Sequence, residues 1–178
     1  MVVEVEIRSF IKKEKYDELL DFFKKNAEFE GEDDQETHYF DGKNDLRIQK
    51  NKSYSKIWLK GGRIHDEERK EVEVKFGRDD FEKLEELFLS LGYNVSIKWF
   101  RKRNSFKWEG LGVSIDYTKG YGYIIELEKL SDENDKDTAL NLLKEKMRIL
   151  NVDITPKELF DKKFEYYREN WEKLALEK

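Results

Sequence analysis

Two pairs of glutamates with Glu-x-Glu spacing are the residues of this chain best suited to bind a metal ion. Glu4 and Glu6 lie near the start, and Glu126 and Glu128 lie in a second stretch of alternating apolar and charged residues. Alternate residues of a strand point to the same face, so each pair presents two carboxylates about 6.5–7 Å apart. Such oxygens are the ligands that Mg²⁺ and Mn²⁺ prefer, and Asp116 could join them. For one strand alone, a solvated charged face explains the spacing more simply.

Basic residues follow the same alternation. The cations expected on polar strand faces are Arg8, Arg47, Lys56, Lys60, Arg69, Lys75, Arg101, Arg103 and Lys107. Both signs on the same faces predict either cross-strand salt bridges on an open sheet or a closed barrel with its polar faces inward. A closed barrel cannot bury unpaired ions in a dry interior, so its lumen would hold water, metal and a highly charged ligand. A polyphosphate fits, because Arg and Lys bind its oxygens while Mg²⁺ bridges them to carboxylates.

The elements that would position these residues can be read from hydrophobic periodicity. Alternation predicts strands over residues 3–8, 46–49, 56–60, 69–76, 97–108, 114–117 and 124–128. A helical period predicts helices over residues 13–25, 79–91, 132–150 and 156–176. Asp79 and Asp80 are expected to cap the second helix, and Thr155 to Glu158 reads as a capping box for the fourth. With no interdomain linker, residues 1–178 are expected to form one domain.

Composition excludes several classes of protein. The 178 residues include no cysteine, which rules out disulfides, Cys-ligated metal sites and a thiol nucleophile. No apolar run reaches the ~18–20 residues of a membrane span, and the start lacks a signal-peptide pattern, so a cytoplasmic location is expected. The net charge of -5 disfavours a nucleic-acid polymer as partner. The sequence has no Walker-type motif, and the isolated His38 and His65 suggest no Ser–His–Asp arrangement.

Six short motifs follow one another from residue 4 to residue 128. They are Glu4-x-Glu6-x-Arg8, Gln35-Glu-Thr-His-Tyr39-Phe40, Leu46-Arg47-Ile48-Gln49, Trp58-Leu-Lys60-Gly61, Arg101-x-Arg103, and Asp116 followed by Gly120-x-Gly122 and Glu126-x-Glu128. In this order they resemble the motifs of the CYTH superfamily, the triphosphate tunnel metalloenzymes. That superfamily includes class IV adenylate cyclases, thiamine triphosphatases and inorganic triphosphatases.

The resemblance implies an α+β fold built on a closed eight-stranded antiparallel β-barrel, a tunnel with a charged lumen and helices packed outside. It implies that the metal ligands for Mg²⁺ or Mn²⁺ are Glu4, Glu6, Glu126 and Glu128, with Asp116 close by. The triphosphate would be held by Arg8, Arg47, Lys60, Arg101 and Arg103, and by Arg69 and Lys75, which alternation places on a polar face. Glu4, Glu6 and Arg8 would be the catalytic residues.

Three positions depart from the family pattern. Arg8 replaces the lysine of the first motif, Gln49 replaces the second arginine of L-R-x-R, and Arg101 replaces the lysine of K-x-R. Arginine stays protonated, so Arg8 can bind phosphate but is a poor proton acceptor. A base would then come from a carboxylate or a metal-bound water.

Three functions remain open. The first is a metal-dependent enzyme acting on a triphosphate. Attack by water would make it a triphosphatase, and attack by the ribose 3′-hydroxyl of ATP would give cAMP and pyrophosphate. The second is a polyphosphate- or nucleotide-binding module with little turnover, and the third is a charged-face sandwich that packs against a protein partner. The helix over 156–176 would either cover the tunnel wall or pair with another subunit in a homodimer.

Overall fold

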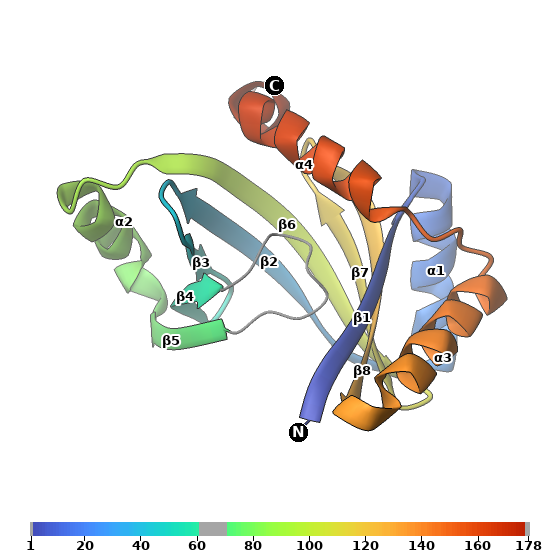
Figure 1. Cartoon of the computed structure of the whole chain (residues 1–178). Helices are drawn as coiled ribbons and strands as arrows, with labels where there is room; N and C mark the ends of the chain where they lie inside the picture. Colours follow the sequence, from blue (N-terminus) through green and yellow to red (C-terminus); the bar gives the residue numbers. More distant parts are fainter. Residues whose placement is uncertain (1, 61–70, 177–178) are drawn as a thin grey trace. The chain divides into compact units, whose positions relative to one another are not determined.

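The computed structural model describes residues 2–60 and 71–176, in which the chain forms eight strands and four α-helices (Figure 1). The strands are β1 (Val2–Ile11), β2 (Glu28–Phe40), β3 (Asp45–Lys50), β4 (Tyr54–Lys60), β5 (Glu71–Gly77), β6 (Val95–Trp108), β7 (Leu111–Thr118) and β8 (Gly122–Asp132). The helices are α1 (Lys13–Asn26), α2 (Phe81–Ser90), α3 (Lys136–Ile149) and α4 (Lys157–Trp171). In the described part of the chain, no helix is long and apolar enough to cross a lipid bilayer.

The strands form one sheet in the order β1-β8-β7-β6-β2-β3-β4-β5. The pairs β1–β8, β2–β3, β3–β4 and β4–β5 are antiparallel. This confirms the predicted α+β class and the antiparallel eight-stranded sheet. β2 is longer than its motif indicated, because it begins at Glu28, in a stretch of acidic residues without clear alternation.

The chain divides into two compact units, which are described separately below. The first contains Met1–Glu32, Arg103–Tyr117 and Gly122–Phe160. The second contains Asp33–Lys102, Thr118–Tyr121 and Asp161–Lys178. Several strands, including β2 and β6, contribute residues to both units.

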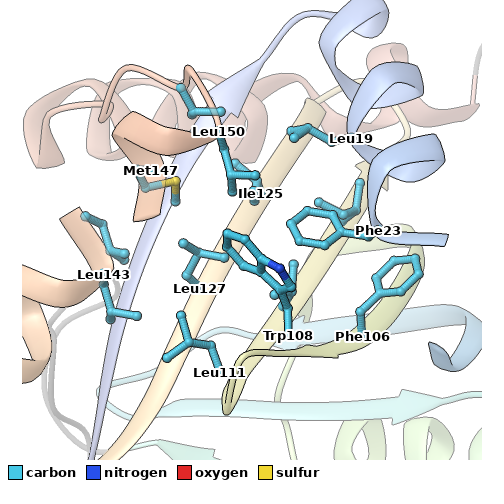
Figure 2. Close-up of a cluster of buried hydrophobic side chains, with 14 of the residues drawn as sticks. Leu19, Phe23, Phe106, Trp108, Leu111, Ile125, Leu127, Leu143, Met147 and Leu150 are labelled. Carbon is cyan, nitrogen blue, oxygen red and sulfur yellow. The ribbon is translucent and has the colours of Figure 1, made fainter. Parts of the chain in front are cut away.

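The core of the first unit lies between the sheet and the helices α1 and α3 (Figure 2). Phe23 of α1 and Leu143 and Met147 of α3 are fully buried. The ring of Trp108 on β6 lies edge-on to Phe23, with centroids 5.4 Å apart. Burying one such side chain stabilises the fold by about 1.5–3 kcal/mol. Because the apolar residues of these strands face the helices, the alternating charged residues lie on the opposite face of the sheet.

The second unit has a smaller core, in which α2 packs on β3. It is built from Phe40, Ile48, Phe81, Leu84 and Phe88. The helical period that predicted this helix includes Leu87 and Leu91 in its apolar stripe, but these two side chains do not face the core. Their exposed fractions are 53% and 65%, because α2 is only ten residues long and buries a single narrow stripe.

At the starts of two helices, the residues that the sequence suggested as caps have other hydrogen-bond partners. Asp80 stands at the N-cap of α2 but makes no capping hydrogen bond with its side chain. Its carboxylate instead accepts a hydrogen bond from Lys83 Nζ at 2.7 Å. Before α4, the Thr155 hydroxyl accepts a hydrogen bond from the backbone N–H of Phe10 at 3.0 Å. Thr155 therefore ties this segment to β1.

Candidate functional site

The polar face of the first unit carries the acidic residues predicted to bind metal. In β1, Val5 and Ile7 are buried in the helix-facing core, so Glu4, Glu6 and Arg8 lie on the other face. The β1–β8 register places Glu6 opposite Glu128 and Arg8 opposite Glu126. Directly opposite residues of an antiparallel pair share a face. The structure thus brings both Glu-x-Glu pairs together, as the sequence predicted.

Arg103 joins two carboxylates of this face. Its Nη2 lies 2.7 Å from Asp116 Oδ2, its Nε lies 3.0 Å from Asp116 Oδ1, and Nη2 lies 3.4 Å from Glu126 Oε1. The exposed fractions of the Arg103 and Asp116 side chains are 22% and 5%. Burial alone would lower the pKa of Arg103, but the charges of Asp116 and Glu126 outweigh it and raise that pKa. Arg103 therefore stays charged and holds both carboxylates in place.

Glu128 has the most perturbed carboxylate of the face. Burial, together with the charges of Glu4 and Glu126, raises the pKa of Glu128 to about 7. The charge of Arg103 acts in the opposite direction but does not cancel these effects. Burial and neighbouring negative charge both disfavour the ionised form of a carboxyl group, and burial is the larger of the two effects here.

Arg8 lies at the rim of this group. Its Nη2 is 3.7 Å from Glu6 Oε1, and its guanidinium carbon lies 5.4 Å from the centre of the Phe160 ring. A guanidinium over an aromatic ring gains a cation–π attraction. Glu6 is thus an ion-pairing partner of Arg8, and the Phe160 ring offers its guanidinium an aromatic surface. A lysine side chain would pack less well on that ring.

The donor set fits a hard divalent cation. Four glutamates and one aspartate supply only oxygen ligands, and burial together with the charges of Glu4, Glu126 and Glu6 raises the pKa of Glu128. Among the residues that the structure describes, no three acidic or histidine side chains are gathered as ligands of one ion. Binding of one ion by three of them would therefore require these carboxylates to converge.

The second unit places Arg47 in a row of paired residues across three strands. Tyr39 of β2 lies opposite Arg47 of β3, which lies opposite Trp58 of β4. The Arg47 guanidinium carbon is 4.2 Å from the centre of the Tyr39 ring and 5.7 Å from that of Trp58. Asp45 accepts hydrogen bonds from Arg47 Nε at 2.6 Å and Nη2 at 2.5 Å.

The other basic residues predicted to bind phosphate have different surroundings. Arg101 donates from Nε and Nη2 to Gln35 Oε1, at 2.8 and 2.6 Å. Lys75 has a side chain that is 60% exposed and lies 3.8 Å from Glu73 Oε1. Lys60 ends β4, but its side chain lies outside the described residues, as does the whole of Arg69.

Gln49, which departs from the family pattern, is buried on the same strand as Arg47. Its Nε2 donates to Thr37 Oγ1 at 2.8 Å. Where the family pattern has a second arginine, this chain thus has a hydrogen-bonded pair of neutral side chains, Gln49 and Thr37, which needs no counter-ion.

His38 belongs to the helix-facing side of the second unit rather than to its polar face. Its ring lies edge-on to Phe81, and its Nε2 is 2.8 Å from Glu36 Oε1. The hydrogen bond to His38 lowers the pKa of Glu36. This placement supports the expectation that His38 is not part of a hydrolase triad; His65 lies outside the described residues.

Sequence reasoning missed the partners of the basic residues. The Asp45-x-Arg47 spacing on one strand could have suggested an ion pair, since it places both side chains on one face. The closeness of Gly112 to Glu128 could not be seen, because it depends on how β7 lies beside β8.

The sequence of most of this chain matches a known domain family. The sequence model of the CYTH domain family matches residues 3–158. The chain belongs to the CYTH domain family.

This CYTH chain is also similar to individual proteins. Over 110 residues, 60% of its length, it is 34% identical to a Methanocaldococcus jannaschii protein named "Putative adenylate cyclase MJ0240". The match covers 62% of that relative's length.

Among solved structures, a conserved hypothetical protein of Pyrococcus furiosus matches with a TM-score of 0.72 and 29% identity, over 85% of this chain and 92% of that one. The PH1012 protein of Pyrococcus horikoshii matches with a TM-score of 0.73 over 87% of this chain and 96% of that one. At 22% identity, the second likeness concerns the fold alone.

Proposed function

We propose that this CYTH chain is a divalent-cation-dependent enzyme that acts on a triphosphate. The observation that carries the proposal is the excess of carboxylates on the polar face of the first unit. Burial and the charges of Glu4 and Glu126 raise the pKa of Glu128 to about 7, and Glu6 lies directly opposite it. A cation placed among these groups would remove the repulsion and favour the ionised form of Glu128.

The residues that would hold Mg²⁺ or Mn²⁺ are Glu4, Glu6, Glu126 and Glu128, with Asp116 close by. When bound, the cation would neutralise charge on phosphate oxygens and link them to the carboxylates. Arg103 fixes Asp116 and Glu126 through its Nε and Nη2 atoms, and its guanidinium carries two further hydrogens on Nη1. Those hydrogens would donate to a phosphate oxygen.

The basic residues of the second unit are also suited to bind phosphate. Arg47 and Arg101 present planar guanidinium groups, which match pairs of phosphate oxygens. The closing of the sheet into the tunnel that the family resemblance implies is part of the proposal. So is the contribution of Lys60, Arg69 and Lys75.

The proposal leaves two reactions, which differ in the nucleophile. The name of the Methanocaldococcus jannaschii relative favours ATP as the substrate, with cAMP and pyrophosphate as products. Attack by water on the same charged group would make the chain a triphosphatase. Arg8 would bind phosphate in either reaction, because an arginine does not accept the proton of the nucleophile.

A product assay separates these reactions. The chain is incubated with ATP, thiamine triphosphate or tripolyphosphate, each with Mg²⁺, with Mn²⁺ or with EDTA. We expect one substrate to give cAMP or phosphate only when a divalent cation is present. Tight binding of all three without any product would instead identify a polyphosphate- or nucleotide-binding module. The absence of both binding and product would leave a domain that packs with a protein partner.

A further inference from the structure

Trp58 of β4 has a buried hydrogen-bond donor that the described residues leave unused. The side chain is only 5% exposed, and no described group accepts a hydrogen bond from its Nε1–H. A buried indole N–H usually finds a partner, because leaving it unpaired costs stability. An unpaired group of this kind in a native fold calls for an explanation, and an absent ligand is one of the few available.

The surroundings of Trp58 indicate what that ligand would be. Trp58 lies opposite Arg47 on one side and opposite Glu73 on the other. Arg47 and Lys56 both lie near its ring, with Lys56 Nζ 4.4 Å from the ring centre. An unpaired donor next to two cations is suited to an anionic oxygen.

Both cations are held by carboxylates in the absence of substrate. Arg47 is hydrogen-bonded to Asp45, and Lys56 Nζ lies 2.7 Å from Glu73 Oε2. A polyphosphate would compete for the same cations, since phosphate oxygens accept the same donors as carboxylates. Such a ligand, bound to Arg47 and Lys56, would bring its anionic oxygens close to the Trp58 side chain.

We propose that the Trp58 indole N–H donates a hydrogen bond to a non-bridging phosphate oxygen of the substrate. This inference rests on the proposed function. It adds one neutral hydrogen-bond donor to the basic residues that are proposed to bind the triphosphate. Trp58 is thereby a substrate-binding residue rather than only a packing residue. An exclusively apolar role would leave ligand affinity unchanged when the N–H is removed but the ring is kept.

The direct test observes the N–H itself. The chain has four tryptophans, so the indole region of a ¹H–¹⁵N NMR spectrum holds four signals, and the one lost in Trp58→Phe belongs to Trp58. The probe is imidotriphosphate with Mg²⁺, an analogue that resists hydrolysis. We expect the Trp58 signal to move downfield on saturation. A Trp58 signal that stays in place at saturation contradicts the proposal.

The second test compares affinity with stability. Trp58→Phe should raise the Kd for Mg²⁺-imidotriphosphate about ten-fold, because a hydrogen bond to a charged acceptor is lost. Its melting temperature should fall less than that of Trp108→Phe, because both variants lose the same ring volume but only Trp58→Phe removes an unpaired buried donor. The matched control is Trp108→Phe, which makes the same change on the helix-facing side of the sheet and should leave the Kd unchanged.

The outcomes separate this inference from the function on which it rests. If the wild-type chain and Trp58→Phe bind equally well, only the role of Trp58 is overturned. If the wild-type chain binds no triphosphate, the proposed function fails and this inference fails with it. If Trp58→Phe does not fold, the signal is assigned by removing the other three tryptophans one at a time, and the titration of the wild-type chain decides.

Discussion

Gly112 on β7 leaves the space that the side chain of Glu128 on β8 occupies. A Cβ atom at position 112 would lie 2.5 Å from both Cγ and Oε1 of Glu128. Real Cβ atoms do not approach other heavy atoms so closely, so any larger residue would displace the carboxylate. The glycine thus fixes where one of the proposed metal ligands lies.

Gly112→Ala should therefore weaken cation binding and destabilise the chain. The added methyl group forces the flexible Glu128 side chain away from its neighbours, and we expect a loss of no more than about 1 kcal/mol in the free energy of unfolding. Denaturant unfolding and Mn²⁺ titration measure the two effects. The control is the same change in a Glu128→Ala background, where the methyl group has room. An equal loss of stability in both backgrounds would show that Glu128 is not the group displaced.

The raised pKa of Glu128 predicts how stability depends on pH. A carboxyl group with a pKa of about 7 in the folded chain and an ordinary value in the unfolded chain binds protons more tightly when folded. Its contribution to stability is therefore complete at low pH and is lost as the pH rises from about 4.5 to about 7. In metal-free buffer, Glu128→Gln should remove this decline and raise stability at pH 8 by about 1–2 kcal/mol.

The comparison for this change is Glu30→Gln, which removes one charge from an exposed residue of β2 in the same unit. Urea unfolding between pH 4 and pH 8 supplies both curves. If the curve of Glu128→Gln had the same slope as that of Glu30→Gln, the carboxylate of Glu128 would not be in the environment described above.

Asp116→Asn should have the opposite effect on stability. Asp116 accepts hydrogen bonds from both Nε and Nη2 of Arg103, and removing its charge leaves that guanidinium with only part of its ion pairing. We expect a loss of about 2–4 kcal/mol at pH 7, somewhat less than for a fully buried pair. Thermal unfolding of Asp116→Asn beside Glu128→Gln tests the contrast. Equal signs for the two variants would contradict the assignment of Arg103 to Asp116.

Asp45→Asn should strengthen the binding of a polyphosphate in the second unit. Asp45 holds both Nε and Nη2 of Arg47, so the carboxylate and a phosphate compete for the same donors. We expect the Kd for tripolyphosphate to fall several-fold, roughly 3- to 10-fold. Asp34→Asn changes the net charge by the same amount at an exposed site and should have a smaller effect. Calorimetry measures both, and equal effects would indicate general electrostatics rather than release of Arg47.

Much of the carboxylate face could be predicted from sequence because its signal is local. Val5 and Ile7 alternate with Glu4 and Glu6, and a strand that buries one face must expose the other set to the opposite side. The same rule placed Arg47 on the face of β3 opposite to the buried Ile48. The apolar stripe of a helix predicts burial less reliably than strand alternation does, since α2 buries Leu84 and leaves Leu87 exposed.

The rest of the site depends on contacts between residues far apart in the chain. The pKa of Glu128 reflects burial and the β1 residue Glu4, so it follows only when β8 is known to pair with β1. The unused donor of Trp58 is likewise a property of its three-dimensional surroundings. The distant partner of Thr155 could not be predicted either, since its hydroxyl accepts a hydrogen bond from the backbone of β1.

The most direct test of the central claim is the turnover of Glu126→Gln combined with Glu128→Gln. The matched control is Glu28→Gln with Glu30→Gln, which removes an exposed pair of the same spacing on β2. With the best substrate and saturating Mg²⁺ or Mn²⁺, the first double variant should lose at least about 100-fold in rate while remaining folded by circular dichroism, and the control should keep the wild-type rate. A Glu126/Glu128 variant that retained most of its activity would show that these carboxylates do not hold the metal.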